Sequence, residues 1–160
     1  MYSFGTDEYI ARMVRTHSGS MLRAAYAVLH SSADAEDAAQ EAFVRLMTRQ
    51  PKLNDEEHEK AWLLRVTINI ARNMRRSSAR EQLPVREDIP AQPGEDRELL
   101  ELVLSLPEKY STIIHLYYYE GYSIREIAGI LNTPPATVGT RLARGRAALK
   151  AMLKGEEDNE

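Results

Sequence analysis

The chain has 160 residues, of which 43% are hydrophobic and 28% are charged, a balance typical of a globular protein. It has no cysteine, which excludes a disulfide framework, a thiolate metal site and a cysteine nucleophile. No uncharged run is long enough for a transmembrane helix, and the first residues show no secretory signal. We therefore expect a cytoplasmic protein without membrane insertion.

Charge is distributed unevenly along the chain, although the net charge is only −3. Residues 60–80 carry six basic and no acidic side chains, and residues 141–154 carry five basic and no acidic ones. Residues 31–59 and residues 81–101 each have a net charge of −5. Two basic blocks between acidic ones indicate two contacts with a polyanion and a separate surface for a basic partner.

The composition favours helices, since Ala and Leu total 36 residues and Val and Ile only 16. In the first half of the chain, apolar periodicity predicts helices near residues 6–30, 34–50 and 57–78. Asp34 is the predicted N-cap of the second helix. Residues 81–94 contain three prolines and a glycine without a helical period, which predicts a linker.

Four further helices are predicted after the linker, near residues 95–105, 107–120, 124–131 and 135–154. Pro107 suits the first position of a helix, as does Pro134 with Thr133 as its N-cap. Ser123 and Glu126 have the spacing of a capping box. The expected fold class is all-α, with two small helical domains joined by a flexible linker. The first domain comprises residues 1–80, the linker residues 81–94 and the second domain residues 95–155. Residues 156–160 form an acidic tail.

The helices near 124–131 and 135–154 have the pattern of a helix-turn-helix, with a short helix, a tight turn and a longer basic helix. The apolar stripe of the longer helix consists of Val138, Leu142, Leu149 and Met152 or Leu153. The side chains that lie away from this stripe are Thr137, Thr140, Arg144 and, at the edge, Arg141. We expect them in a major groove, because Arg bonds two acceptors of guanine and Thr contacts bases or phosphates. Arg146 and Lys150 lie on another flank that suits phosphates; the alternative is a basic helix that packs only on its own domain.

The helix near 57–78 also has a polar face, on which arginines are interspersed with asparagines. Opposite an apolar stripe of Leu63, Val66, Ile70 and Met74, this face carries Arg65, Asn69, Arg72, Asn73, Arg76 and Arg80. Arginine supplies charge to a nucleic-acid backbone, and asparagine bonds base edges. Trp62 lies on the same face, where it either stacks on an unpaired base or packs against another helix.

Three stretches of the sequence resemble the bacterial sigma-70 family, specifically the short extracytoplasmic-function (ECF, group IV) sigma factors of RNA polymerase. Residues 34–43 (DAEDAAQEAF) resemble region 2.2, which docks on the clamp helices of the polymerase β′ subunit. The segment 61–76, with AWL at its start and Asn69 and the Arg75–Arg76 pair further on, resembles regions 2.3 and 2.4, which melt and read the −10 element. The stretches that resemble region 4, which reads the −35 element, are LPEKY at 106–110, EG at 120–121, Ser123, EIA at 126–128, TV at 137–138 and RLAR at 141–144.

The resemblance implies a factor without a catalytic site, cofactor or metal that acts as a subunit of RNA polymerase and directs promoter-specific initiation. By position, Asp37, Gln40 and Glu41 would contact core polymerase, and Asn69 and its neighbours would hold a flipped base of the non-template strand. Further implied partners are the polymerase β flap, promoter DNA and an anti-sigma factor. Gly139 stands where the family often has Lys or Arg, which removes a −35 contact.

Two other classes of protein compete with this interpretation. A stand-alone helix-turn-helix regulator would use residues 1–80 as an interaction domain and bind duplex DNA without polymerase. An enzyme is the third alternative, but the four histidines have no metal-ligand spacing and no phosphate loop or nucleophile elbow is present. The Asn/Arg face and the acidic segment 34–41 favour the sigma factor over the regulator.

Overall fold

The structure is a computed structural model that describes the backbone of residues 7–77 and 96–158. The predicted linker, residues 81–94, and Arg80 lie outside the described residues. The chain divides into two compact units, Met1–Leu83 and Pro84–Glu160. The described part of both units is helical and contains no strand, which confirms the all-α fold class with two helical domains.

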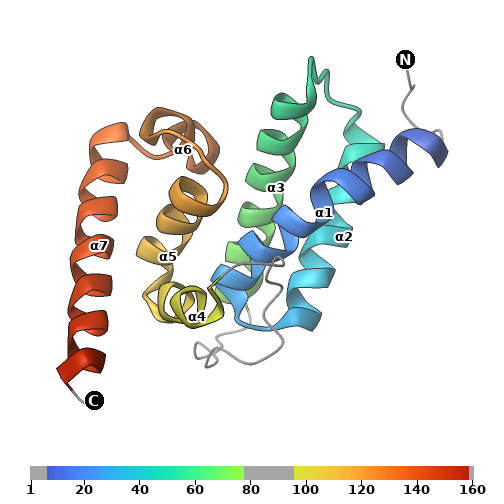
Figure 1. The fold of residues 1–160 in the computed structure, drawn as a ribbon. Helices are drawn as coiled ribbons and strands as arrows, with labels where there is room; N and C mark the ends of the chain where they lie inside the picture. The colour runs from blue at the N-terminus through green and yellow to red at the C-terminus, as the bar shows by residue number, and fades with distance from the viewer. Residues whose placement is uncertain (1–6, 78–95, 159–160) are drawn as a thin grey trace. The chain divides into compact units, whose positions relative to one another are not determined.

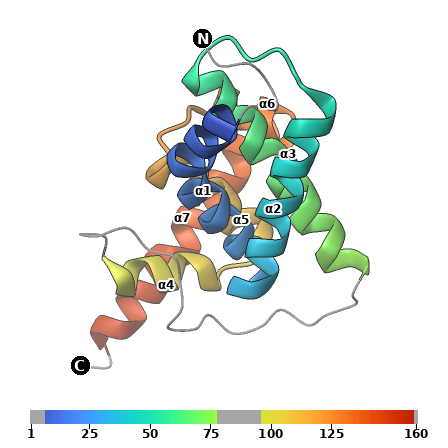
Figure 2. The same ribbon diagram turned by 90° about the vertical axis from the view of Figure 1, so that its right-hand side faces the viewer.

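Over residues 7–77 the first unit is a bundle of three helices, each of which packs against the other two (Figures 1 and 2). These helices are α1 (Asp7–Leu29), α2 (Ser32–Arg49) and α3 (Glu56–Ser77). Its largest fully buried side chains are Met13, Met21, Tyr26, Leu46, Leu63, Leu64 and Ile68. Burying the apolar stripe of α3 in this core leaves the opposite, polar face of α3 toward solvent.

The N-cap of α2 is Ser31, so the prediction of Asp34 was wrong. Ser31 is extended, with φ −143° and ψ 119°, and its hydroxyl accepts a hydrogen bond from the backbone N–H of Asp34 at 3.2 Å. Asp34 instead lies in the first turn, where the attraction between its carboxylate and the positive end of the helix dipole stabilises the helix.

The described part of the second unit contains a short π-helical turn and four α-helices, with α5 and α6 both packed on α7 (Figure 1). The elements are α4 (Arg97–Ser105), α5 (Glu108–Ile114), η1 (His115–Tyr119), α6 (Ile124–Leu131) and α7 (Pro135–Asp158). Pro107 directly precedes α5 instead of being its first residue. The helix α7 begins at Pro135, as the predicted range 135–154 has it, so Pro134 precedes the helix and is not its first residue.

The Glu120–Gly121 pair ends η1 and directs the chain into α6. The N–H of Glu120 bonds to the carbonyl of His115 at 3.1 Å, and that of Tyr122 bonds to Leu116 at 3.0 Å. Gly121 has a φ of 76°, a conformation that glycine adopts without steric cost. Beneath this turn the Nε2 atom of His115 lies 3.3 Å from the Oε1 atom of Glu120, and both side chains are buried.

The predicted helix-turn-helix is present. Ser123 and Glu126 form the expected capping box at the start of α6, each bonding the backbone N–H of the other. Asn132 ends α6 in the left-handed region with a φ of 51°. The carbonyl of Pro134 then accepts the N–H of Val138 at 3.1 Å in the first turn of α7.

The apolar stripe of α7 is buried only in its first half. Val138 and Leu142 are buried, Leu149 and Met152 are half-buried, and Leu153 is 39% exposed. Burial decreases because α7 has 24 residues, about 36 Å at 1.5 Å per residue, and outruns the shorter α5 and α6. Met74, predicted in the core stripe of α3, is also only half-buried, near the end of that helix.

Two glycines of α7 provide a matched test of this packing. A Cβ atom on Gly145 would lie 2.7 Å from Cδ1 of Ile114 and 3.2 Å from Cβ of Tyr110, whereas a Cβ atom on Gly139 meets nothing within 4 Å. We expect Gly139→Ala to stabilise the protein by about 1 kcal/mol through helix propensity. Gly145→Ala should destabilise it by about 1 kcal/mol, because overpacking against buried Ile114 outweighs that gain. Thermal unfolding of both variants checks this, and a higher melting temperature for Gly145→Ala would contradict it.

Candidate nucleic-acid interfaces

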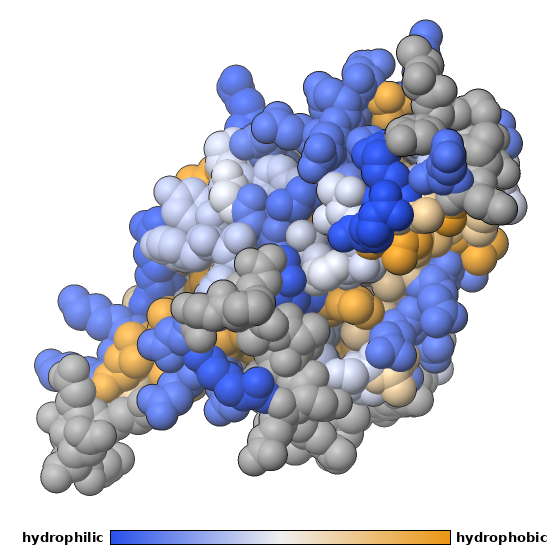
Figure 3. Space-filling view, turned by 45° about the vertical axis from the view of Figure 1, so that its right-hand side comes forward, coloured by the Kyte–Doolittle hydropathy of each residue, from blue (hydrophilic) through white to orange (hydrophobic). Residues whose placement is uncertain are grey.

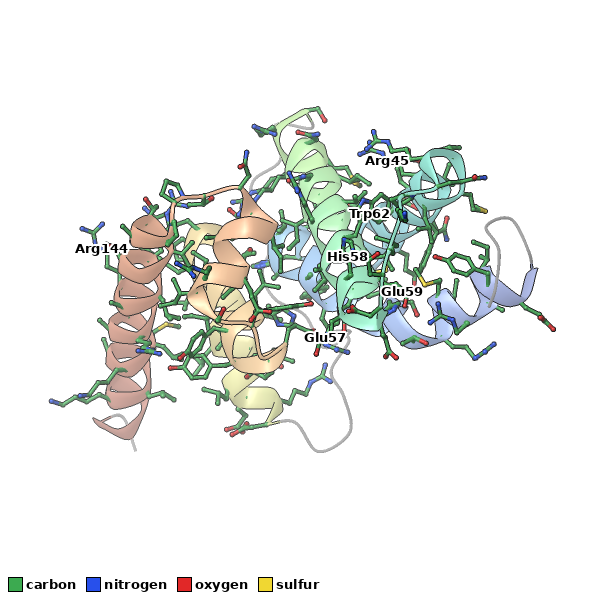
Figure 4. The ribbon with its side chains drawn as sticks, turned by 90° about the horizontal axis from the view of Figure 1, so that it is seen from above. Arg45, Glu57, His58, Glu59, Trp62 and Arg144 are labelled. Carbon is green, nitrogen blue, oxygen red and sulfur yellow. The ribbon has the colours of Figure 1, made fainter. Side chains whose placement is uncertain are left out.

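A hollow of about 380 Å³ opens between the start of α5 and the N-terminal half of α7. Its lining consists of Lys109, Tyr110, Ala136, Thr137, Thr140, Arg141 and Arg144. The structure therefore brings together the four side chains predicted for the major groove. Arg144 extends outward from α7 in Figure 4, and Arg141 is half-buried at the edge of the hollow.

The α5 side of this hollow was not predicted. Lys109 is exposed, and its Nζ atom lies 5.0 Å from the ring centroid of Tyr110, a cation–π distance. The sequence did carry the signal, since Lys109 belongs to the LPEKY stretch. Helical periodicity, however, orders side chains within one helix and does not show which neighbouring helix borders the same groove.

Arg146 and Lys150 lie outside the lining of this hollow. The guanidinium of Arg146 lies 5.4 Å from the ring centroids of both Tyr117 and Tyr118. The two rings form an edge-to-face pair with their centroids 4.9 Å apart. Arg146 is therefore held on an aromatic pair, a contact that the prediction of a phosphate-binding flank did not include. Lys150 is exposed on α7, as predicted.

The polar face of α3 is accessible along most of its length. Exposed positions are Arg65, Asn69, Asn73 and Arg76, while half-buried positions are Trp62 and Arg72. The guanidinium of Arg76 donates a hydrogen bond to the Oδ1 atom of Asn73. The amide NH₂ of Asn73 is thus the group that this contact leaves for a base.

This face continues onto α2 through a second hollow, of about 570 Å³, at the C-terminal end of α3. It is lined by Arg45, Ile70, Asn73, Met74, Arg76 and Ser77. Arg45 comes from α2, where Figure 4 shows it beside α3, and sequence reasoning had not assigned it to this face. Its Nε atom lies 3.5 Å from Oε1 of Glu41, one helical turn earlier.

The outer face of α2 combines polar and apolar side chains. Asp37, Gln40 and Glu41 are all exposed, as expected for contact residues. Val44 is 45% exposed and Met47 is 40% exposed, and their spacing from Gln40 places them on the same face. Sequence reasoning missed both, although apolar residues four and seven positions after Gln40 were a visible signal. On the face of the molecule that Figure 3 shows, orange apolar patches interrupt a mostly blue, hydrophilic surface.

A partly buried ion pair fixes the start of α3 against α1. Glu59 is only 6% exposed, and its Oε1 and Oε2 atoms accept hydrogen bonds from Arg12 at 3.3 and 2.5 Å. The hydrogen bond to Glu59 is the main reason that the pKa of Arg12 is raised. His17, with Nε2 4.0 Å from Oε1 of Glu59, has a lowered pKa because burial disfavours its charged form. Glu59 and Trp62 are labelled in Figure 4, one turn apart on α3.

Over residues 8–77 and 96–155 no three His, Asp or Glu side chains are grouped so as to hold a metal ion. None of the helices over these ranges combines the length and apolarity that crossing a bilayer requires.

Both units match known sequence families. The profile of sigma-70 region 2 matches residues 13–81, and the profile of sigma-70 region 4 matches residues 96–149. The chain is 31% identical over 171 residues to the ECF RNA polymerase sigma factor SigW of Bacillus subtilis (strain 168). The alignment covers 94% of this chain and 91% of that protein. It is 32% identical over 157 residues to the ECF RNA polymerase sigma factor SigE of Mycolicibacterium smegmatis, which covers 88% of this chain and 60% of that protein.

Solved structures show the same fold. The sigma factor RpoE of Bartonella quintana, crystallised with the anti-sigma factor NepR, superposes with a TM-score of 0.74 at 20% identity, covering 93% of this chain and 98% of that one. CnrH in complex with the cytosolic domain of CnrY gives a TM-score of 0.66 at 22% identity, covering 94% of this chain and 91% of that one.

Two helical units, one with an Asn/Arg face and the other with a helix-turn-helix, define a two-domain DNA-binding protein. The chain belongs to the extracytoplasmic-function sigma factors of RNA polymerase. The prediction of a factor that directs transcription initiation is confirmed, which decides against the stand-alone regulator.

The buried His17 gives the first unit a testable pH dependence. Because its pKa is lowered in the folded state from the ordinary value of 6.5, the unfolded chain binds this proton at higher pH. The stability due to neutral His17 is complete above that value and falls as pH decreases, by at most about 1.4 kcal/mol per pH unit. We expect His17→Leu to lose less stability than the wild type between about pH 7 and about pH 5.5, as measured by urea unfolding. Equal losses in the two proteins would contradict this assignment.

Proposed function

We propose that α3 and α7 each bind one element of the same promoter. In this proposal residues 1–80 bind core polymerase and the −10 element, and residues 95–155 bind the −35 element. Residues 81–94 link them and residues 156–160 form an acidic tail. The observation that carries the proposal is the presence, in one chain, of two separate units that each expose a cationic helix face beside a hollow.

The α7 face is proposed to read the −35 element in the major groove. Arg141 and Arg144 make no ion pair with an acidic side chain of the described residues, so both guanidinium groups are available to base or phosphate acceptors. Thr140 donates its hydroxyl proton to the carbonyl of Ala136 at 3.0 Å. The lone pairs of the Thr140 hydroxyl oxygen therefore remain available to a hydrogen-bond donor. Arg supplies base discrimination, and the hydroxyl groups and Lys150 add contacts.

The α3 face is proposed to hold the melted non-template strand of the −10 element. Extracting a base costs a few kcal/mol, and capture of the base and its phosphates offsets that cost. Asn69 offers an exposed amide for a base edge, and Arg65 lies one turn away for the backbone. Trp62 is half-buried, so part of its ring packs on the bundle and the remainder is open to stacking.

The α2 face is proposed to dock on the clamp helices of polymerase β′, while the second unit meets the β flap. Asp37, Gln40 and Glu41 supply polar contacts, and the exposed Val44 and Met47 supply apolar area further along the same face of α2. An anti-sigma factor is a further proposed partner, supported by the structural likeness to RpoE, which was crystallised with the anti-sigma factor NepR. The proposal has no catalytic residue in this chain and places it with RNA polymerase in the cytoplasm.

The −35 assignment predicts a loss of selectivity on substitution of Arg144. In reconstituted transcription with core polymerase and a promoter library, Arg144→Ala should weaken use of −35-dependent promoters by about 1–3 kcal/mol, because a bidentate base contact is lost. The matched control is Arg97→Ala, since Arg97 is an exposed cation of the same unit that pairs with Glu101 at 3.6 Å. Promoter selection that is the same for both variants would reject the role of Arg144.

The −10 assignment predicts a defect in DNA opening. Asn69→Ala should slow promoter melting, followed by permanganate reactivity of unpaired thymines, while binding of core polymerase stays at the wild-type level. This separation arises because Asn69 is on α3 and the proposed polymerase contacts are on α2. Equal loss of melting and of polymerase binding would indicate a folding defect and contradict the assignment.

A further inference from the structure

The turn between α5 and α6 contains a buried pair of ionisable side chains that the proposed contacts do not use. The side chains of His115 and Glu120 are only 1% and 2% exposed, and their Nε2 and Oε1 atoms lie at an ion-pair distance of 3.3 Å. Neither ring nitrogen of His115 has a hydrogen-bond partner among the described residues. Burial of such groups is costly, and an apolar pair of similar size is often at least as stable. Stability alone therefore does not account for this pair.

The pair depends on a change in helical hydrogen bonding at this point of the chain. In an α-helix, side chains five residues apart point about 140° away from each other, at about 100° per residue. Over η1, however, the N–H of Glu120 bonds to the carbonyl of His115, five residues earlier, at 3.1 Å. This wider turn brings residue 120 back to the side of the helix that carries His115. The His115 ring also stacks on Tyr119, with centroids 5.6 Å apart and planes at 16°.

The register of this turn affects where the next helices lie. One additional residue in a turn rotates the outgoing chain by about 100° before it enters α6. Because α6 packs on α7, this rotation also bears on the N-terminal half of α7, whose Thr137, Arg141 and Arg144 line the 380 Å³ hollow. A contact between residues 115 and 120 favours the π-helical register and is lost in an α-helical one. Buried polar pairs of this kind are best known for selecting one register over another.

We propose that the His115–Glu120 pair selects the π-helical register of η1 and thereby positions the helix-turn-helix for the −35 element. This inference rests on the proposed function. An N–H at Nε2 of His115 attracts the carboxylate of Glu120 whether the imidazole is neutral or charged. Both are positioning residues, because they contact each other inside the second unit and act on DNA only through α6 and α7.

Replacing both partners by apolar side chains separates positioning from stability. The variants are His115→Leu, Glu120→Leu and the double variant, each in the full chain. The control is Leu104→Ala, since Leu104 is 2% exposed in α4 of the same unit and lies outside the turn.

Three quantities are measured for each variant. The first is the melting temperature, and the second is the hydrogen-exchange rate, by NMR, of the backbone N–H groups of residues 120 and 122, which bond to His115 and Leu116. The third is the −35 selectivity of holoenzyme assembled with core polymerase. It is the ratio of initiation at a promoter selected from a library by the wild type to initiation at the same promoter with a scrambled −35 element.

We expect the double variant to melt no lower than either single variant, because it leaves no unpaired buried polar group. The N–H groups of residues 120 and 122 should nevertheless exchange about tenfold faster than in the wild type, because the π-helical register is no longer selected. The −35 selectivity of the double variant should fall several-fold. Leu104→Ala should melt lower than the wild type and keep its selectivity.

Three results would overturn the inference and leave the proposed function intact. These are wild-type exchange and selectivity in the double variant, a double variant that melts below both single variants, and an equal loss of selectivity in Leu104→Ala. Wild-type holoenzyme that initiates equally well with the natural and the scrambled −35 element would overturn the proposed function itself.

Discussion

The main electrostatic feature of this protein is cationic charge that the described residues do not neutralise. Arg65 on α3 and Arg141 and Arg144 on α7 are not paired with acidic side chains there. Keeping like charges together on a folded surface is unfavourable unless a polyanion compensates them. Binding to DNA does so and releases counterions, which makes the association strongly dependent on salt. The net charge of −3 does not reveal this, because acidic segments such as that around Glu41 balance the total.

The helical scaffold presents these charges on rigid surfaces. In the first unit, the pair of half-buried Arg12 and buried Glu59 holds the first turns of α3 against α1, so the Asn/Arg face has a fixed direction. In the second, Gly145 allows α7 to approach α5 closely enough for both to border one hollow. The positive φ of Gly121 and the Ser123 capping box set where α6 starts. Packing inside each unit therefore determines the direction in which the exposed arginines lie.

Much of this arrangement could be predicted from sequence periodicity. The stripe of Leu63 and Ile70 placed the opposite face of α3 in solvent, and Asn69 is exposed as that pattern required. The helix-turn-helix followed in the same way, since Thr137 and Arg144 share one hollow. Within a single helix, the period of 3.6 residues determines which side chains lie together, and no knowledge of other helices is needed.

The features that sequence reasoning missed depend on contacts between elements. Lys109 and Arg45 border the hollows only because α5 and α2 pack beside α7 and α3. Arg146 lies over Tyr117 and Tyr118, and a helical-wheel projection of α7 alone cannot show this contact because the two rings belong to η1. The wrong prediction of the α2 N-cap has a different cause. Ser31 and Asp34 both have side chains that can cap a helix, and the hydrogen bond from the N–H of Asp34 to the hydroxyl of Ser31 selects Ser31.

The central claim, that this chain gives core RNA polymerase its promoter specificity, is tested most directly by reconstituted transcription. Core polymerase is supplied with a promoter library in the absence and presence of the full-length chain, and RNA 5′ ends are mapped. The account predicts a new set of start sites that share two conserved upstream elements and that appear only when the chain is added. The same start sites with and without the chain, or no association of the chain with core polymerase, would contradict it.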